Sequence, residues 1–345
     1  MTTNELLPRT MQVLELTDYE GVAALHVREK PLPQPGPGQV LIKMAAAPAN
    51  PSDLMFVRGL YGIKKPLPIV PGFEGSGVVV AAGPGALGRL WVGRRVAAGA
   101  PDKGDGTWAQ YMVASAQGCF PLRRSVSLEQ GAMVFVNPLT AWALVDIARR
   151  AKHAAIVQTA AASALGQMIR AQAQRHGLPV VNVVRRPEQV ALLEAQGAKY
   201  VLDSNAESFD RRLRDLCRDL KATIAFDAVA GELTGRILTN LPKRGRVVVY
   251  GALSEEGSFV QPGDLIFRDK AVKGFWLGTW LPKAGLPRTL WAMWQIQSLI
   301  ASDFRSTVRN RVDLVGAHDG LRAYANEMTG GKLLITPNGA AFAGG

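Results

Sequence analysis

The hydrophobic pattern of the chain changes near residue 150. Before that point, short apolar runs such as 39–49, 75–83 and 94–99 are separated by segments rich in Gly and Pro. Short apolar runs between turn residues are typical of β-strands joined by loops. The first part of the chain is therefore predicted to be a mostly-β domain with long loops.

From residue 154 onward, strand-like apolar runs alternate with helix-like segments. The strand-like runs are 154–160, 179–184, 199–203, 222–231 and 245–252. Because these runs are apolar on both sides, they predict a parallel sheet covered by helices on both faces. This α/β pattern indicates a doubly wound, Rossmann-type nucleotide-binding domain over 138–302.

Length and composition fit two soluble domains. A chain of 345 residues exceeds what one hydrophobic core usually supports. The tail 303–345 is too short to fold alone, so we expect it to join residues 1–137 in the first domain. No apolar run is long enough to span a bilayer. The first residues resemble no leader sequence, so we expect a cytoplasmic protein that is not bound to a membrane.

The charge and the cysteine content narrow the function classes. The chain has 40 basic and 28 acidic residues, a net charge of +12, which favours anionic partners such as phosphorylated cofactors or serves solubility alone. The basic residues are scattered without a nucleic-acid motif, so no nucleic-acid partner is expected. Only Cys119 and Cys217 and four histidines are present, and none has the spacing of a structural zinc site or a disulfide framework.

Two segments of the second domain carry candidate cofactor chemistry. The turn 160–166 ends in Gly166 and has small residues where the dinucleotide fingerprint G-x-G-x-x-G has its other glycines. It suits a pyrophosphate at a helix N-terminus or is an ordinary tight turn. Further on, Arg185 and Arg186 stand where NAD-binding folds usually have an acidic residue. Arginine pairs with a 2′-phosphate, so this position favours NADPH over NADH, unless both are merely exposed surface residues.

The first domain contains three motifs that together resemble the medium-chain dehydrogenase/reductase superfamily. They are Ala47–Asp53 (APANPSD), Gly59–Gly62 (GLYG) and Pro71–Gly75 (PGFEG). The resemblance implies a GroES-like catalytic domain. Zinc-dependent members have metal ligands at three places that are occupied here by Asn50, Phe73 and Val136. The chain is thus similar to the zinc-free members, and no bound metal is expected.

Within the superfamily, the chain most resembles the 2-enoyl thioester reductases, with the quinone oxidoreductases next. The resemblance rests on Gly59–Gly62, Val136–Ala141 (VNPLTA), Asn182–Arg185 (NVVR) and the segment from Leu265 to Leu277. Ala162 and Ala164 depart from the reductase turn, which usually has asparagine and glycine there. Tyr61 does not discriminate, because quinone oxidoreductases often carry a tyrosine nearby.

The resemblance implies a role for each matching residue. Tyr61 would be the catalytic proton donor or the group that stabilises the enolate, unless it is a packing tyrosine in its loop. The implied cofactor-binding residues are Asn137 at the nicotinamide, Ala162, Ser163, Ala164 and Leu165 at the phosphates, Arg185 and Arg186 at the 2′-phosphate, Tyr250, Gly251, Ala252, Leu253, Phe275, Trp276 and Leu277 along the cleft, and Lys332 from the tail.

These expectations define one preferred function and two alternatives. The preferred one is a zinc-independent, NADPH-dependent reductase of an activated C=C bond, with an enoyl thioester or enone as the acceptor. The alternatives are an NADPH:quinone oxidoreductase and a non-catalytic NADPH-binding sensor. An apolar strand at 271–277 predicts an exposed sheet edge that pairs with its copy, and therefore a homodimer. Trp291 and Trp294, three apart in a predicted helix, are expected in the hydrophobic core rather than in a substrate pocket.

Overall fold

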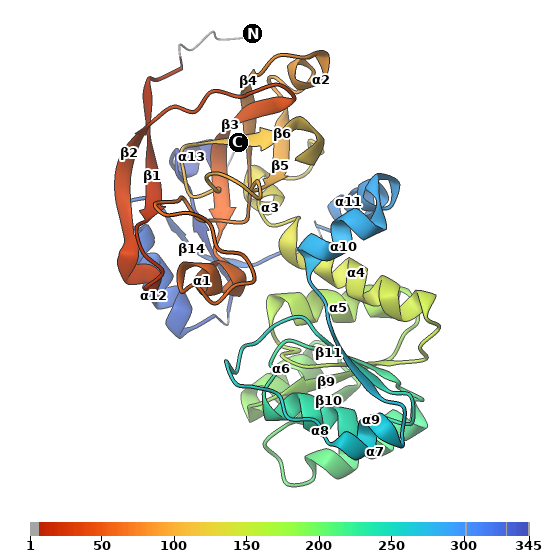
Figure 1. Ribbon diagram of the computed structural model, residues 1–345. Helices are drawn as coiled ribbons and strands as arrows, with labels where there is room; N and C mark the ends of the chain where they lie inside the picture. The colour runs from red at the N-terminus through yellow and green to blue at the C-terminus, as the bar shows by residue number, and fades with distance from the viewer. Residues whose placement is uncertain (1–6, 301, 329, 344–345) are drawn as a thin grey trace. The chain divides into compact units, whose positions relative to one another are not determined.

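The computed structural model describes residues 7–300, 302–328 and 330–343. Its internal contacts divide the chain into two compact units. The first unit combines residues 1–136 with 293–345, and the second comprises residues 137–292. Each unit has its own sheet and its own core, and each is described by itself below (Figure 1).

The first unit is built around a seven-stranded sheet in the order β14-β15-β3-β4-β5-β7, with β6 paired to β3. The two strands that precede this sheet in the sequence, β1 and β2, form a separate antiparallel pair. The strands are β1 (Thr10–Leu16), β2 (Leu25–Pro31), β3 (Gln39–Pro48), β4 (Glu74–Ala82), β5 (Arg95–Gly99), β6 (Tyr111–Ser115), β7 (Cys119–Pro121), β14 (Val308–Val312) and β15 (Lys332–Ile335).

The first unit also contains short helices. They are η1 (Gly21–Ala24), α1 (Pro51–Val57), α2 (Ala86–Arg89), η2 (Ala116–Gly118), α3 (Leu128–Gly131), α12 (Ala317–Asn326) and α13 (Ala340–Ala343). The tail supplies β15, which pairs antiparallel with β3 through Leu334 and Pro48. This pairing brings residues from the two ends of the chain together.

The second unit contains a six-stranded, all-parallel sheet in the order β10-β9-β8-β11-β12-β13. The strands are β8 (Ile156–Gln158), β9 (Val180–Val184), β10 (Tyr200–Asp203), β11 (Ile224–Asp227), β12 (Arg246–Val249) and β13 (Ala271–Gly274). From β8 to β12, each strand is followed by a helix and then by the next strand. This is the doubly wound fold that the alternating pattern predicts.

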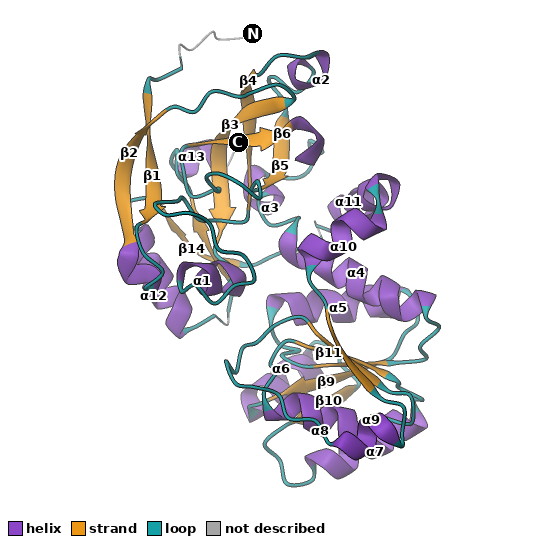
Figure 2. Cartoon of the chain, in the orientation of Figure 1, coloured by secondary structure: helices purple, strands orange, loops and turns teal. Residues whose placement is uncertain are grey.

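Helices cover both faces of this parallel sheet (Figure 2). The helices of this part of the chain are α4 (Val136–Arg150), α5 (Ala164–Arg175), α6 (Pro187–Ala195), α7 (Phe209–Asp219), α8 (Glu232–Asn240), α9 (Pro262–Ile266), α10 (Leu277–Ala284) and α11 (Leu286–Leu299). Of these, α10 and α11 contact α4, through the rings of Trp280 and Trp291 against Trp142. One core packs strand residues such as Val181 against α7 and α8, and a second packs Val184 against α6. Because Val181 and Val184 belong to the same strand, both of its faces are buried, as the unbroken apolar runs predict.

The two cysteines are small buried residues. Cys119 lies in β7 and Cys217 in α7, both as free thiols. Burial raises the pKa of each thiol to about 12. Neither thiol is therefore ionised near neutral pH.

Two local expectations are wrong. The strand expected over 271–277 ends at Gly274, and Leu277 already begins α10. Trp291 and Trp294 are not core residues, since they are 49% and 61% exposed on α11. Both indole rings are still partly engaged, because Trp291 contacts Trp142 edge-on and Arg123 lies over the ring of Trp294.

The second boundary between the units also differs from the expected one. The second unit ends at Ala292, inside α11, rather than at 302. The end of α11 packs on the first unit's strands because Gln297 accepts from the Arg123 amide at 2.9 Å and donates to the Pro121 carbonyl at 3.1 Å. Among the described residues, no helix has both the length and the apolar character needed to cross a membrane.

Candidate active and cofactor-binding site

The second unit has a topological switch point at the carboxyl ends of β8 and β11. From there the chain continues to β9 and β10 on one side and to β12 and β13 on the other. Nucleotides bind in open α/β sheets at such a point. Thr159, directly after β8, donates its hydroxyl to Asp227 at the end of β11, over 2.7 Å. Asp227 is fully buried and also accepts from the Val229 amide and the Thr234 hydroxyl. This carboxylate therefore joins the loops that follow β8 and β11.

The turn after β8 leads directly into the N-terminus of α5. Ala160 has a φ of 47°, and Ser163 caps α5 by accepting from the Gly166 amide at 3.1 Å. A Cβ on Gly166 would lie 2.7 Å from the carbonyl oxygens of Ala160 and Ala161, so only glycine permits this close approach. The predicted residues Ala162–Leu165 are partly exposed at this helix N-terminus. The Ser163 amide is already bound to the Ala160 carbonyl at 2.9 Å. The amides of Ala164 and Leu165 in the first turn of α5, together with the helix dipole, suit a pyrophosphate.

The two arginines lie at the end of the neighbouring strand, β9. Arg185 and Arg186 are exposed, and Arg186 is the N-cap residue of α6. Among the described residues, neither guanidinium has an ion pair with an acid. Asn205 fixes the backbone here by donating to the Arg185 carbonyl at 2.9 Å. The geometry leaves both cations available for an anion.

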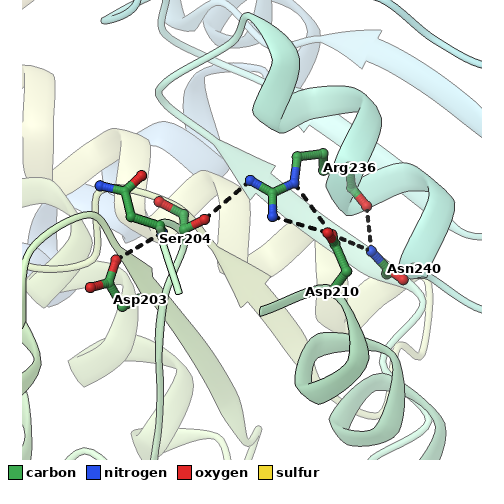
Figure 3. A network of polar contacts seen from close by, with 6 residues as sticks. Asp203, Ser204, Asp210, Arg236 and Asn240 are labelled. Carbon is green, nitrogen blue, oxygen red and sulfur yellow. Dashed lines mark hydrogen bonds and ion pairs between the residues drawn. The ribbon is translucent and has the colours of Figure 1, made fainter. Parts of the chain in front are cut away.

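The loop that carries Asn205 is itself braced by a polar network (Figure 3). The guanidinium of Arg236 on α8 donates to the Ser204 carbonyl at 3.1 Å and to the Asp210 carboxylate at 3.0 Å. Asn240 donates to the same carboxylate at 2.9 Å. The network holds the β10–α7 loop against α8. Asn205 belongs to this loop, so its hydrogen bond to the Arg185 carbonyl fixes the backbone at Arg185 as well.

The remaining predicted residues follow β12 and β13 at the same edge of the sheet. The Tyr250 amide donates to the Asp227 carbonyl at 2.8 Å, and the Phe275 amide donates to the Val249 carbonyl at 2.8 Å. The Tyr250 hydroxyl is buried and has no hydrogen-bond partner within the described part of the chain. Burial, with the nearby charge of Asp227, raises the pKa of Tyr250. A buried, unpartnered hydroxyl fits a position where a bound ligand supplies the missing partner.

In the first unit, polar residues gather where α1 begins. Asn50 is the N-cap residue of α1, and its backbone N–H donates to the Asp53 carboxylate at 2.8 Å. The other oxygen of Asp53 accepts from the Phe73 amide at 3.0 Å. The Asn50 side chain donates to Glu74 at 2.9 Å and accepts from the Lys332 ammonium. All four polar side chains of this cluster are buried.

Glu74 links this cluster to the start of α4. Its second oxygen accepts from the Val136 amide at 2.8 Å and from the Phe135 amide at 3.1 Å. Asn50, the Phe73 backbone and the Val136 backbone, which occupy the three places of the zinc ligands, are thus all engaged by one hydrogen-bonded cluster. Within the described ranges, no group of three His, Cys, Asp or Glu side chains is arranged to hold a metal ion.

Tyr61 borders the same cluster. It lies in the loop after α1 and is half-buried, with its ring 4.8 Å from the ring of Phe73. Gly59 gives this loop a φ of 67°. Phe73 packs edge-on against Phe56 on its other side. Tyr61 is therefore placed next to the residue whose amide binds Asp53.

Burial raises the pKa of Asp53 to about 7, helped by the charge of Glu74 and opposed by the amides of Asn50 and Phe73. The folded carboxyl keeps its proton to a higher pH than the unfolded one. Between about pH 4 and pH 7, raising the pH should therefore lower the free energy of unfolding, by up to about 1.4 kcal/mol per pH unit. Outside that window this group should contribute no slope.

Urea unfolding of the wild type and of Asp53→Asn over this pH range checks the prediction. The amide cannot titrate, so the variant should lack this part of the slope, although its overall stability should be lower. Only the difference between the two slopes matters, because all other titrating groups are common to both proteins. Parallel pH profiles would contradict the raised pKa.

The structure brings most of the predicted residues into two groups. Ala162–Leu165, Arg185, Arg186 and Tyr250–Leu253 lie at one sheet edge of the second unit, whereas Tyr61 and Lys332 lie in the first unit. Lys332 contacts Asn50 there, and Asn137 begins the second unit directly after Val136. The sequence reasoning missed Asp53, Glu74, Thr159 and Asp227. Asp227 had a signal, because it lies at the end of an apolar strand. Asp53 and Glu74 lie in motifs whose other residues carry the family resemblance, and Thr159 lies in the apolar run 154–160.

Two family models match the chain. The model of the alcohol dehydrogenase GroES-like domain matches residues 36–124, and the model of the zinc-binding dehydrogenases matches residues 164–293. Among curated proteins, the mitochondrial enoyl-[acyl-carrier-protein] reductase of Arabidopsis thaliana is 32% identical over 70% of this chain. That match spans 65% of the plant protein, just under two thirds of its length. The enzyme of the same name from Xenopus tropicalis is 31% identical over 76% of this chain and 75% of its own length.

Solved structures extend the similarity to the whole fold. A putative NADPH:quinone reductase from Mesorhizobium loti is 36% identical, with a TM-score of 0.88 over 98% of this chain and 100% of that protein. A mycobacterial protein solved in complex with NADPH is 26% identical, with a TM-score of 0.80 over 95% of this chain and 100% of its own. With two matching domain models and a fold shared from end to end, the chain belongs to the medium-chain dehydrogenase/reductase superfamily.

Proposed function

We propose that the protein is an NADPH-dependent reductase that saturates the activated C=C bond of a 2-enoyl thioester. The observation that carries the proposal is the position of Tyr61 against Phe73, at a place where zinc-dependent members have a metal ligand. A phenol there can activate the acceptor by donating a hydrogen bond or a proton to it. The names of the curated relatives, mitochondrial enoyl-[acyl-carrier-protein] reductases, support the choice of acceptor.

NADPH is the proposed cofactor because two exposed arginines follow β9. Arginine forms charge-assisted, bidentate bonds with a 2′-phosphate, whereas an acid at this place would repel it. Ala162–Leu165 would present backbone N–H groups to the pyrophosphate. When bound, the cofactor supplies a hydride.

The residues of the first unit would manage charge and protons. The hydride adds to the β-carbon, and the C=C electron pair moves toward the thioester carbonyl, whose oxygen becomes negative. The Tyr61 hydroxyl would donate a hydrogen bond to that oxygen or deliver the proton that the α-carbon takes up. The acceptor would thus gain one hydride, which the bound cofactor would supply, and one proton, so its C=C bond would become a single bond.

Oxidation of NADPH in the presence of crotonyl-CoA, compared with a benzoquinone, tests this function. We expect steady turnover with the thioester and a higher kcat/KM than with the quinone. Faster quinone turnover would favour the second candidate, an NADPH:quinone oxidoreductase, which the printed name of the Mesorhizobium loti neighbour supports. NADPH binding without oxidation by any thioester, enone or quinone would favour a sensor.

We also propose that the protein is a homodimer. β13 is an edge strand, and three of its four residues are exposed. Next to it in sequence, α9 and its end expose Leu265, Ile266 and Phe267, the last by 78%. Exposed apolar groups beside an open strand edge are characteristic of a surface that is covered in solution.

Sedimentation velocity at micromolar concentration should therefore give the mass of two chains. Replacing both Ile266 and Phe267 by Lys should shift the protein toward the monomer, since the apolar contact would be lost to charge. Lys substitutions at Leu90 and Val92, which are also exposed but lie in the first unit, serve as the control. A wild-type protein that sediments as one chain would refute the proposal.

A further inference from the structure

Lys332, Asn50 and Glu74 form a chain of hydrogen bonds that runs in one direction. The ammonium of Lys332 donates to the Asn50 side-chain oxygen, and the Asn50 side-chain nitrogen donates to Glu74 at 2.9 Å. Glu74 then accepts from the Phe135 and Val136 amides. Because an ammonium can only donate, it fixes the direction of every later bond in the chain.

The fold brings these residues together from distant parts of the sequence. The antiparallel register that pairs Leu334 with Pro48 places Lys332 opposite Asn50, and the Ala49 amide donates to the Leu333 carbonyl at 3.0 Å. Lys332, Asn50 and Glu74 are each 5% exposed or less. A buried charge needs an opposite charge and satisfied hydrogen bonds. Lys332 and Glu74 provide these for each other through Asn50.

The chain of bonds ends where the backbone leaves the first unit. Phe135 and Val136 are its last residues, and Asn137 is the first of the second unit. Val136 also begins α4, whose first N–H groups have no partner within the helix. Glu74 supplies that partner, so the backbone directly before Asn137 is held by a carboxylate.

We propose that Lys332 is a positioning residue, a cation supplied by the protein in place of a metal, which acts through Asn50 and Glu74 to fix the backbone that presents Asn137. The importance of Asn137 rests on the proposed function. This assignment differs from the direct cofactor contact that the family resemblance implies for Lys332. It also gives Glu74 and Asn50 a shared task that neither has alone.

The fixed direction of the chain makes the proposal testable by a double-mutant cycle. In Glu74→Gln, Lys332 still holds the Asn50 oxygen, so the new amide nitrogen faces the Phe135 and Val136 N–H groups and both bonds are lost. In Lys332→Met, Glu74 is left buried without its cation. In the double variant, the amides at positions 50 and 74 are both free to turn over, and the amide oxygen introduced at position 74 can accept from the two backbone groups again.

We therefore expect each single variant to speed amide exchange at residues 135 and 136 by at least about tenfold. We also expect each to lower kcat by about tenfold or more while the NADPH Kd stays within about twofold. The double variant should recover most of both losses. The matched control is Lys270→Met, which removes another buried lysine, paired with Asp264 at 2.9 Å in the second unit. It should lower the melting temperature without changing exchange at 135 and 136.

Three outcomes would overturn the proposal. Losses that simply add in the double variant would show that Lys332 does not set the direction of the chain. A raised NADPH Kd with unchanged kcat in Lys332→Met would return Lys332 to cofactor contact. Unchanged exchange at residues 135 and 136 in both single variants would remove the link to α4. Amide exchange is measured without turnover, so it tests the network independently of the activity. A protein that reduces no acceptor, but whose variants show the expected changes in exchange, would refute the proposed function and support the network.

Discussion

Replacing Tyr61 by Phe should lower kcat for a 2-enoyl thioester by about tenfold to a thousandfold, with NADPH affinity nearly unchanged. The substitution keeps the ring that packs on Phe73 and removes only the hydroxyl. If this hydroxyl donates a hydrogen bond to the developing negative charge, its loss raises the free energy of the transition state but not that of the bound substrate. Turnover with a quinone should fall less, because a quinone oxygen accepts negative charge more readily.

Tyr19→Phe provides a matched control for this experiment. Tyr19 belongs to the same aromatic cluster through Phe56, and its hydroxyl donates to the Lys65 carbonyl at 2.8 Å. Its removal should affect stability and leave kcat unchanged. Equal turnover of Tyr61→Phe and the wild type on every acceptor would make Tyr61 a packing residue and would remove the main support for the proposed chemistry.

Replacing Arg185 by Ala should remove most of the preference for NADPH over NADH. The expected loss is about 1.5–3 kcal/mol of NADPH binding, the range for charge-assisted hydrogen bonds. NADH has no 2′-phosphate, so its Kd should stay nearly constant. Titration of both cofactors against wild type and variant measures the change directly.

Arg212→Ala is the control for the loss of one positive charge. Arg212 is exposed on α7, away from the loop after β9 in sequence. It should change neither Kd appreciably. A wild type that binds NADH more tightly than NADPH would contradict the proposed cofactor, whatever the variants do.

The parallel sheet was predictable because its strands are buried on both faces. Runs such as 179–184 do not alternate and are apolar except at Asn182, and β9 occupies most of that run. Local signals also indicated the turn at Gly166 and the arginines at 185 and 186. Each of these predictions rests on residues close together in the sequence.

The remaining features depend on contacts over long distances. The Lys332–Asn50 contact joins residues 282 positions apart, and only the pairing of β15 with β3 brings them together. Trp291 and Trp294 lie three positions apart in a predicted helix, which favours a place in the core. Their exposure depends on which face of α11 meets its unit, and the spacing along the helix does not reveal that face.

The burial of the two cysteines has a chemical consequence for the proposed reaction. Enoyl thioesters, enones and quinones are electrophiles that add readily to thiolates. Cys119 and Cys217 are the only cysteines of the chain, and burial holds the pKa of each at about 12. The protein thus offers the proposed acceptors almost no sulfur nucleophile, and repeated turnover should not alkylate it.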